Sequence, residues 1–242
     1  MCFVASFLLF GICDNCFMKN CLKNVFLVIL ITGCGKEAVD SAQVITQNPP
    51  IQTRPDPTPQ QLPSIKKVPY QNHQWRLGWS DTVAFTAKDL EFDKIEVRSQ
   101  DLIEANCPGY AFSSSDQRLG FWIVFIAAMA QEESSFNESL RYYENGLGKY
   151  SEGLLQLSTS DAYYHSGCRG IDSETILVGE ENLACGLSIL KEQLNGKPGR
   201  GITPGTLFPS SYYYWSVLTK AVTRARIGQF IKNHWDQLPF CH

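Results

Sequence analysis

The sequence lacks the charge, the metal-ligand spacing and the internal repeats that mark several large classes of protein. Its formal net charge is only −3, which gives no sign of a nucleic-acid partner. Its four downstream cysteines form no C-x-x-C pair and have only His165 near them, so we expect no metal site and no cofactor. What remains is an ordinary apolar content, sufficient for a sizeable core.

The charges are unevenly distributed along the chain. Residues 101–192 hold fourteen acidic and five basic side chains, whereas residues 193–242 hold one acidic and six basic ones. The middle of the protein is therefore acidic and its end is basic.

The N-terminus resembles the export signal of bacterial lipoproteins. Two lysines precede an apolar run at 25–31 that is too short to span a bilayer comfortably, and I-T-G-C, ending at Cys34, is similar to a lipobox. The resemblance implies that Cys34 is lipidated and that residues 1–33 are a signal region. Because no positive charge precedes the apolar run of the first seventeen residues, we expect translation to begin at Met18. The alternative is an uncleaved signal anchor.

Residues 34–70 have the composition of a disordered tether. Seven of the twelve prolines fall between residues 35 and 70. Such a segment cannot bury enough apolar surface to offset its ordering entropy. We therefore expect a lipid-anchored spacer that holds a folded domain, residues 71–242, away from a membrane, in the periplasm or at the cell exterior.

The patterns in the folded part are mainly helical. The clearest helix spans 119–134 with a cap at 115–117, and its centre is apolar on all faces. Further helices are expected over 180–194, over 211–232 and, as two short pieces, within 75–103. The stretch 136–161 predicts loops or a small irregular hairpin.

Glu132 and Glu133 end the buried helix. Adjacent helical residues point about 100° apart, so the two carboxyl groups cannot share one role. A carboxyl group at the end of an apolar helix is partly desolvated, which raises its pKa and keeps it protonated near neutrality. A glycosidase needs that state in order to protonate a leaving oxygen.

Four short motifs follow in order within residues 107–232. They are Glu133-Ser134-Ser135-Phe136, Gly153-Leu154-Leu155-Gln156, the helical stretch from Asn182 to Leu190, and the aromatic segment from Phe208 to Tyr214. They resemble the E-S-x-F, G-L-M-Q, N-[IL]-x-x-G-x-x-[YI]-L and A-Y-N motifs of the soluble lytic transglycosylase and goose-type lysozyme superfamily. The closest resemblance is to a cysteine-containing branch. Leu155 replaces the family methionine, and Tyr214 replaces the family asparagine.

The resemblance implies a mainly α, lysozyme-like fold with a long substrate cleft. It implies a peptidoglycan glycosidase, a lysozyme in which Glu133 protonates the oxygen of the β-1,4 bond between the two amino sugars. Ser134 and Gln156 would line the cleft, and Tyr213 or Tyr214 would bind sugar, since a tyrosine offers both an apolar ring and a hydroxyl.

The resemblance leaves open what completes the reaction. A lytic transglycosylase needs only one glutamate, because a hydroxyl of the substrate closes an anhydro ring. An inverting hydrolase needs a second carboxylate for water. We favour hydrolysis, with Glu152 as the second carboxylate and Glu144 and Asp161 as the other candidates. A non-catalytic peptidoglycan-binding envelope lipoprotein is the alternative of another class.

Four cysteines in an exported domain predict two disulfides, with buried free thiols as the alternative. Counting alone allows three pairings. We predict that Cys168–Cys185 fixes the loop after the G-L-L-Q segment to the helix at 180–194. Cys107–Cys241 would then hold the C-terminus.

The acidic middle of the chain bears on the substrate. Glu132, Glu138, Glu144 and Glu152 lie close to Glu133 in sequence. If two of them face the cleft, it should favour cationic sugar, and N-deacetylated peptidoglycan is such a glycan. We expect a monomer whose partners are peptidoglycan strands and, through the lipid, a membrane.

Overall fold

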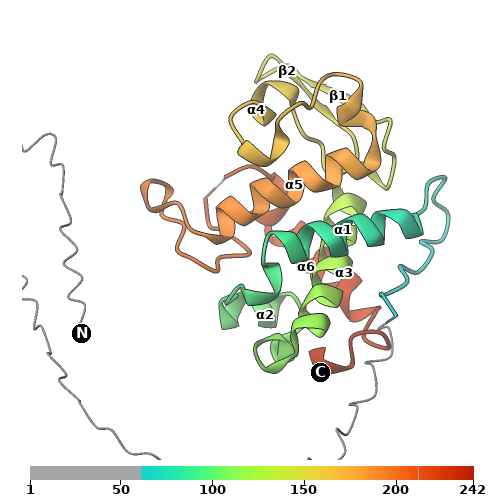
Figure 1. Cartoon of the computed structure of the whole chain (residues 1–242), viewed down its shortest axis with the longest axis vertical. Coiled ribbons are helices and arrows are strands. Elements are labelled where there is room, and N and C mark those ends of the chain that lie inside the picture. The colour runs from blue at the N-terminus through green and yellow to red at the C-terminus, as the bar shows by residue number, and fades with distance from the viewer. Residues whose placement is uncertain (1–60, 212) are drawn as a thin grey trace, which may run out of the picture. The chain divides into compact units, whose positions relative to one another are not determined.

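The computed structural model describes residues 61–242 except residue 212, and this part of the protein is mainly helical (Figure 1). The expected signal region, Met18 and Cys34 lie outside the described residues. The elements, joined by short 3₁₀ turns, are α1 (Leu77–Asp89), α2 (Ser99–Glu104), α3 (Ser115–Ser134), β1 (Arg141–Glu144), β2 (Lys149–Glu152), α4 (Thr159–Ala162), α5 (Gly179–Leu194) and α6 (Ala221–Lys232). Among these residues no helix is long and apolar enough to cross a membrane.

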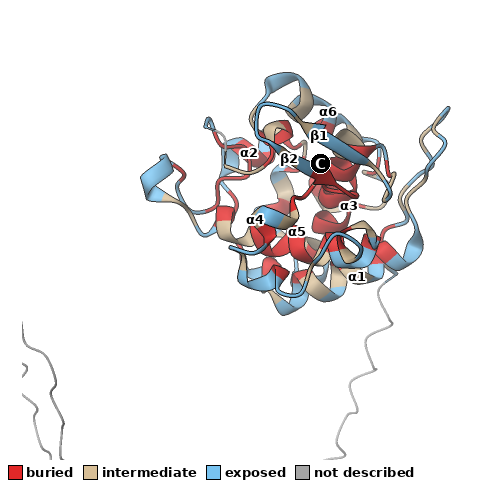
Figure 2. Ribbon diagram, turned by 90° about the horizontal axis from the view of Figure 1, so that it is seen from above, coloured by how far each residue is buried: buried red, intermediate tan, exposed pale blue. Residues whose placement is uncertain are grey.

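Helix α3 is the central element, because every residue from Leu119 to Ala130 is buried (Figure 2). It packs against α1 and α6, and α1 also packs against α5. The prediction of a helix buried on every side is confirmed, but its cap lies one residue earlier than expected. Ser114 accepts a hydrogen bond from the backbone N–H of Gln117, and the Gln117 side chain accepts one from the backbone N–H of Ser114. This reciprocal capping box satisfies two backbone donors at the start of the helix.

The predicted helix over 180–194 is present as α5, but the one over 211–232 is only partly present. Only α6 is an α-helix there, and the residues before it form an irregular segment with a short turn at Ser216–Leu218. Trp215 explains the difference, because its ring is buried and its indole N–H donates to the carbonyl of Leu155, 2.8 Å away. Tertiary contacts therefore override helical propensity in this segment.

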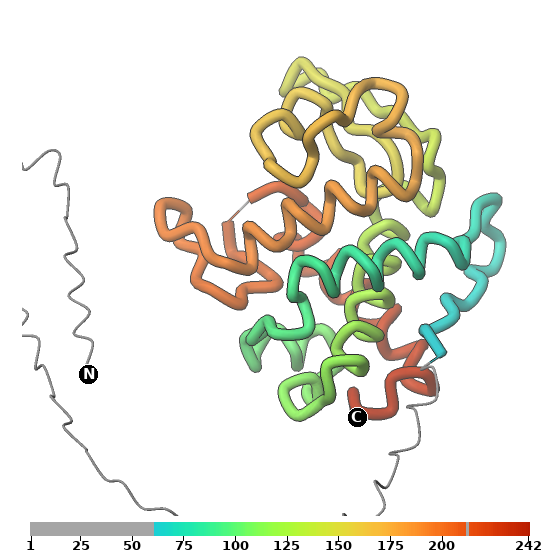
Figure 3. The backbone as a smooth tube through the Cα atoms, in the orientation of Figure 1, coloured from blue at the N-terminus to red at the C-terminus, as the bar shows by residue number. Residues whose placement is uncertain are grey.

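The folded domain begins earlier than the tether boundary at residue 70 implies. Pro63 is buried and lies where a side chain on Gly120 would touch it. The backbone N–H of Lys66 donates to Nε2 of His234 over 3.0 Å, and Gln237 hydrogen-bonds the backbone of Ser64 through both ends of its amide. Residues 62–68 thus form a strap beside the C-terminal end of the chain (Figure 3). Its backbone groups hydrogen-bond to His234 and Gln237 instead of to water. The composition of the segment alone did not indicate this packing.

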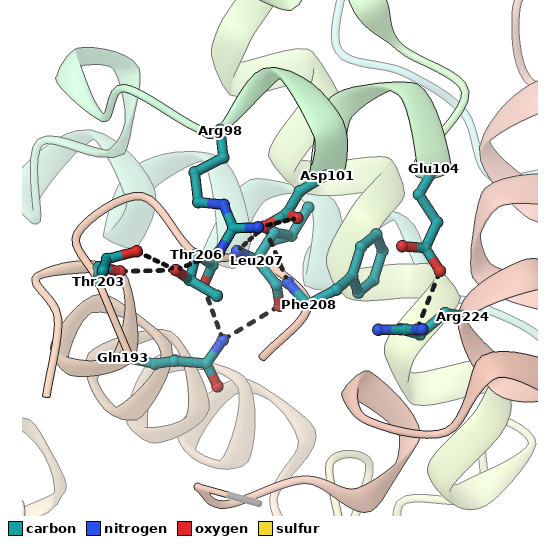
Figure 4. A network of polar contacts seen from close by, with 9 residues as sticks. All are labelled: Arg98, Asp101, Glu104, Gln193, Thr203, Thr206, Leu207, Phe208 and Arg224. Carbon is teal, nitrogen blue, oxygen red and sulfur yellow. Dashed lines mark hydrogen bonds and ion pairs between the residues drawn. The ribbon is translucent and has the colours of Figure 1, made fainter. Parts of the chain in front are cut away.

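A polar network fixes the loop that leads toward the irregular segment (Figure 4). The buried carboxylate of Asp101 accepts the backbone N–H groups of Leu207 and Phe208 at 2.7 and 3.2 Å. Gln193, on α5, donates to the carbonyls of Thr206 and Leu207, both at 3.1 Å. The loop is therefore held to α2 and α5 without regular secondary structure.

Two disulfides join segments that are separate along the chain. They are Cys168–Cys185 and Cys107–Cys241, the two pairs that the sequence predicts. The first joins the turn at Ser166–Cys168 to α5, and the second holds the C-terminus beside the turn at Pro108–Phe112. Disulfides persist in oxidising compartments, so they indicate that this domain is exported.

The two disulfides should differ in how much they stabilise the fold. They close loops of 17 and 134 residues, and the loss of unfolded-chain entropy grows with loop length. We expect replacement of Cys168 and Cys185 by alanine to cost roughly 3 kcal/mol, and replacement of Cys107 and Cys241 roughly 5 kcal/mol. Urea unfolding of the two double variants measures both values, and a larger loss for the short loop would contradict this account.

Candidate active site

Glu133 lies in the last turn of α3, and the residues after it explain why the helix stops there. Ser135 and Phe136 both have left-handed backbone angles, with φ of 52° and 63°. The N–H of Phe136 donates to the carbonyl of Ala130, and its ring is buried, which is the arrangement of a Schellman-type helix end. The E-S-x-F motif therefore ends α3 and places the carboxyl group of Glu133 just after the buried part of the helix.

A pocket of about 560 Å³ opens at this end of α3. Its volume is in the range of sites that bind small ligands. It is lined by Glu133, Leu140, Tyr142, Glu144, Leu147, Lys149, Ser151, Gln156, Ser158, Asp161, Tyr214, Trp215 and Ser216. The predicted residues Glu133, Glu144, Gln156, Asp161 and Tyr214 are thus brought together.

The β1–β2 hairpin forms one wall of the pocket, and its register decides which side chains face inward. Tyr142 pairs with Ser151 and Glu144 pairs with Lys149, and all four line the pocket. Side chains alternate between the two faces of a strand, so the intervening pairs point to the opposite face. Sequence analysis missed Tyr142, Lys149 and Ser151 because it did not establish this register.

Glu152, the favoured second carboxylate, is on the face away from the pocket. It pairs with Arg141 in the hairpin register, is only 3% exposed, and lies 3.2 Å from Nε of that arginine. Burial raises the pKa of Glu152, and the charge of Arg141 opposes this. Strand alternation thus places Glu144, and not Glu152, in the pocket lining. The carboxylate of Glu144 accepts a hydrogen bond from the hydroxyl of Ser151.

The G-L-L-Q and N-L-x-x-G motifs interlock. Asn182 accepts the N–H of Leu155 at 2.8 Å and donates to the carbonyls of Glu152 and Ile176. Gly153 has a φ of 74°, and a side chain there would lie 2.4 Å from the Asn182 amide. A side chain on Gly186 would likewise lie 2.3 Å from Leu155, so this glycine leaves room for the loop that carries Leu155.

Two predicted sugar-binding residues, Ser134 and Tyr213, are not among the residues that line the pocket. Ser134 is buried, and its hydroxyl donates to the carbonyl of Ala130 at 3.1 Å, so α3 itself takes up its hydrogen bond. The hydroxyl of Tyr213 donates to Glu192 at 3.1 Å. Tyr214 takes the place in the pocket, and its hydroxyl accepts the N–H of Ser158 at 3.1 Å.

The electrostatics of the pocket favour a protonated Glu133. Burial first, and the charge of Glu144 second, raise its pKa to about 8 against the opposing charge of Lys220. The negative end of the α3 dipole disfavours a carboxylate in the same position. Glu132 differs, because it lies 3.0 Å from Arg226 on α6 and outside the pocket lining. Glu133 therefore holds a proton at neutral pH.

Two other charged groups of the pocket lining, Lys149 and Asp161, neutralise each other. Lys149 and Asp161 form an ion pair that joins the hairpin to α4. Within the described part of the chain, no cluster of three or more His, Cys, Asp or Glu side chains is arranged to hold a metal ion.

Comparison with known proteins gives a likeness in fold only. No family model and no curated protein matches the chain. Solved structures of the Bdellovibrio protein Bd0314 DslA do match it. The wild-type form is 24% identical, with a TM-score of 0.52 over 68% of this chain and 91% of that one. A variant with a single glutamate replaced by glutamine is 23% identical and also scores 0.52. The described domain therefore has a fold related to that of DslA.

The raised pKa of Glu133 predicts a pH-dependent loss of stability. Between 4.5, the ordinary pKa of a glutamate, and about 8, the folded protein binds a proton that the unfolded chain has released. Stability should therefore fall as the pH rises through this window. Glu133→Gln should be more stable than the wild type at pH 8, with the difference vanishing toward pH 4.5. Urea unfolding across this range checks it, with the exposed Glu96→Gln as control, and parallel curves for Glu133→Gln and wild type would contradict it.

Proposed function

We propose that this protein is a peptidoglycan glycosidase with a lysozyme-like fold that hydrolyses the β-1,4 bond of glycan strands. The observation that carries the proposal is a carboxyl group protonated at neutral pH in a pocket that also holds a second carboxylate. Glycosidases use two such groups in different protonation states. The resemblance of the E-S-x-F, G-L-L-Q and N-L-x-x-G segments to the lysozyme superfamily supports the choice of peptidoglycan.

In the proposed reaction, Glu133 donates its proton to the oxygen that leaves the broken bond. Glu144 accepts a proton from a water molecule, which attacks the sugar carbon from the other side. Water then supplies the hydroxyl of the new end, and both carboxyl groups exchange protons with solvent to restore the starting state. Gln156 and Tyr214 would contact the sugar, and both are held by hydrogen bonds to the backbone of the pocket wall.

The choice of hydrolysis over a transglycosylase reaction rests on Glu144. A transglycosylase needs no carboxylate for water, whereas the charge of Glu144 is near enough to raise the pKa of Glu133. The DslA structures include two glutamate-to-glutamine variants whose substituted positions are eleven residues apart. Glu133 and Glu144 have the same separation in sequence. This spacing supports the pair as the two acting groups.

Substitution of the two glutamates tests the reaction. Glu133→Gln and Glu144→Gln should each lower cleavage of purified cell wall by roughly 10²–10⁴-fold, because each removes a proton-transfer group. Glu132→Gln, outside the pocket, is the matched control and should keep activity within about threefold of wild type, since it loses one ion pair, with the largely exposed guanidinium of Arg226. Mass spectrometry of the products decides the reaction. Reducing ends mean hydrolysis, and anhydro ends would contradict the role of Glu144.

We also propose a preference for N-deacetylated peptidoglycan, with fewer acidic side chains in the pocket than the sequence suggested. Of the four neighbouring glutamates only Glu144 lines the pocket, because Glu132, Glu138 and Glu152 pair with Arg226, Arg76 and Arg141. With Glu133 protonated, two carboxylates face one ammonium group in the pocket, which leaves one negative charge. A free amino sugar carries the complementary charge.

Matched cell walls test this preference. A deacetylated wall should be digested faster than the same wall after chemical re-acetylation, and added salt should reduce the difference because it screens the attraction. Equal or faster digestion of the acetylated wall would remove the preference without affecting the role of Glu133.

We also propose that the protein is a monomeric lipoprotein anchored through Cys34, as the lipobox resemblance implies. Cys34→Ser should move the protein from the membrane fraction to the soluble fraction on cell fractionation. A variant that stays with the membrane would favour the uncleaved anchor instead.

A further inference from the structure

Most exposed aromatic side chains in the described part of the domain are on the hairpin or directly after α4, and two of them, Tyr143 and Tyr150, are on the hairpin face away from the pocket. The largest buried side chains of the domain include Trp79, Trp122 and Phe121, which form the core. By contrast, five tyrosines between residues 142 and 164 are exposed, and all of them lie on the hairpin or directly after α4. Tyr163 and Tyr164 are 84% and 81% exposed. Water-exposed rings of this size mark a surface that meets a partner when they are grouped.

The residues around Tyr163 and Tyr164 place this pair at the rim of the pocket. Asp161, two residues earlier, lines the pocket, and its ion pair with Lys149 joins α4 to the hairpin wall. His165, one residue later, has its ring 6.0 Å from that of Tyr214, which also lines the pocket. The chain before the tyrosine pair is therefore part of the pocket wall, and the residue after the pair lies beside a side chain of that wall.

The backbone that carries the two exposed rings is held by hydrogen bonds to the turn before it. The N–H of Tyr164 donates to the carbonyl of Asp161 at 2.9 Å, and the next N–H donates to Ala162 at 3.0 Å. The ring centroids of Tyr163 and Tyr164 are 5.5 Å apart, with planes at 87°. The two rings therefore contact each other edge to face, and the pair presents an exposed apolar surface with two hydroxyl groups. A sugar ring has the matching chemistry, with apolar C–H faces and hydroxyl groups at its edge.

We propose that Tyr163 and Tyr164 form an outer binding platform for the part of a glycan strand that extends beyond the pocket. The inference rests on the proposed function, because only a polymeric substrate continues past the sugars at Glu133. A strand that leaves the pocket on the α4 side crosses this rim, and stacking on the rings holds it there. The platform makes the protein selective for long strands over short fragments.

Binding measurements on a non-cleaving protein test the platform separately from catalysis. In the Glu133→Gln background, the dissociation constants for long peptide-free glycan strands and for tetrasaccharide fragments are measured with and without Tyr163→Ala and Tyr164→Ala. The double alanine change should weaken binding of long strands roughly tenfold, which corresponds to about 1.4 kcal/mol. Phenylalanine at both positions should keep most of the binding, because the rings remain. Phe112→Ala is the matched control, since Phe112 is 93% exposed on the turn at Pro108–Phe112 and does not line the pocket.

The ratio of the two dissociation constants decides the outcome. A selective loss for long strands supports the platform. An unchanged affinity for long strands, or an equal loss for both ligands, overturns it. Failure of the proposed function would appear elsewhere, as wild-type protein that leaves purified cell wall intact.

Discussion

The burial of α3 from Leu119 to Ala130 is the constraint on which the rest of the structure depends. A helix that is apolar on every face must be covered on every face, and α1, α6 and the short turns at Phe92–Lys94, Pro108–Phe112 and Ser216–Leu218 are arranged around it. Because the helix stops one residue after Glu133, the carboxyl group lies where burial ends and the pocket begins. The raised pKa of Glu133 follows from that position, because burial makes its ionised form costly.

Which of the two hairpin acids faces the pocket is decided by a different kind of constraint. Glu144 and Glu152 are both on the hairpin, and either is close enough in sequence to the motifs to be a candidate. The register pairs Glu144 with Lys149 and Arg141 with Glu152, so alternate faces receive the two acids. Arg141 stabilises the charge of Glu152 on the face away from the pocket. A shift of β2 by one residue in this register would turn Glu152 to the face that carries Glu144.

The short motifs gain their meaning from contacts with one another. Asn182 hydrogen-bonds three backbone groups of the segments before it, and Gly153 and Gly186 leave the room that this packing needs. Trp215 donates to the carbonyl of Leu155 and so fastens the irregular segment to the same loop. These contacts form one structural unit behind the pocket. The polar cost of a buried asparagine is offset because every one of its hydrogen bonds is made.

The sequence by itself determined the buried helix, its glutamate at the C-terminal end and the helix α5, because helical periodicity and desolvation act over a few neighbouring residues. It did not determine the strap at 62–68, whose hydrogen bonds come from residues near the C-terminus. Nor could it place Ser134 and Tyr213 outside the pocket, since Ala130 and Glu192 take up their hydroxyl groups. Only the tertiary structure decided that Glu144 rather than Glu152 lines the pocket, because strand register depends on pairing across the hairpin and not on the composition of either strand.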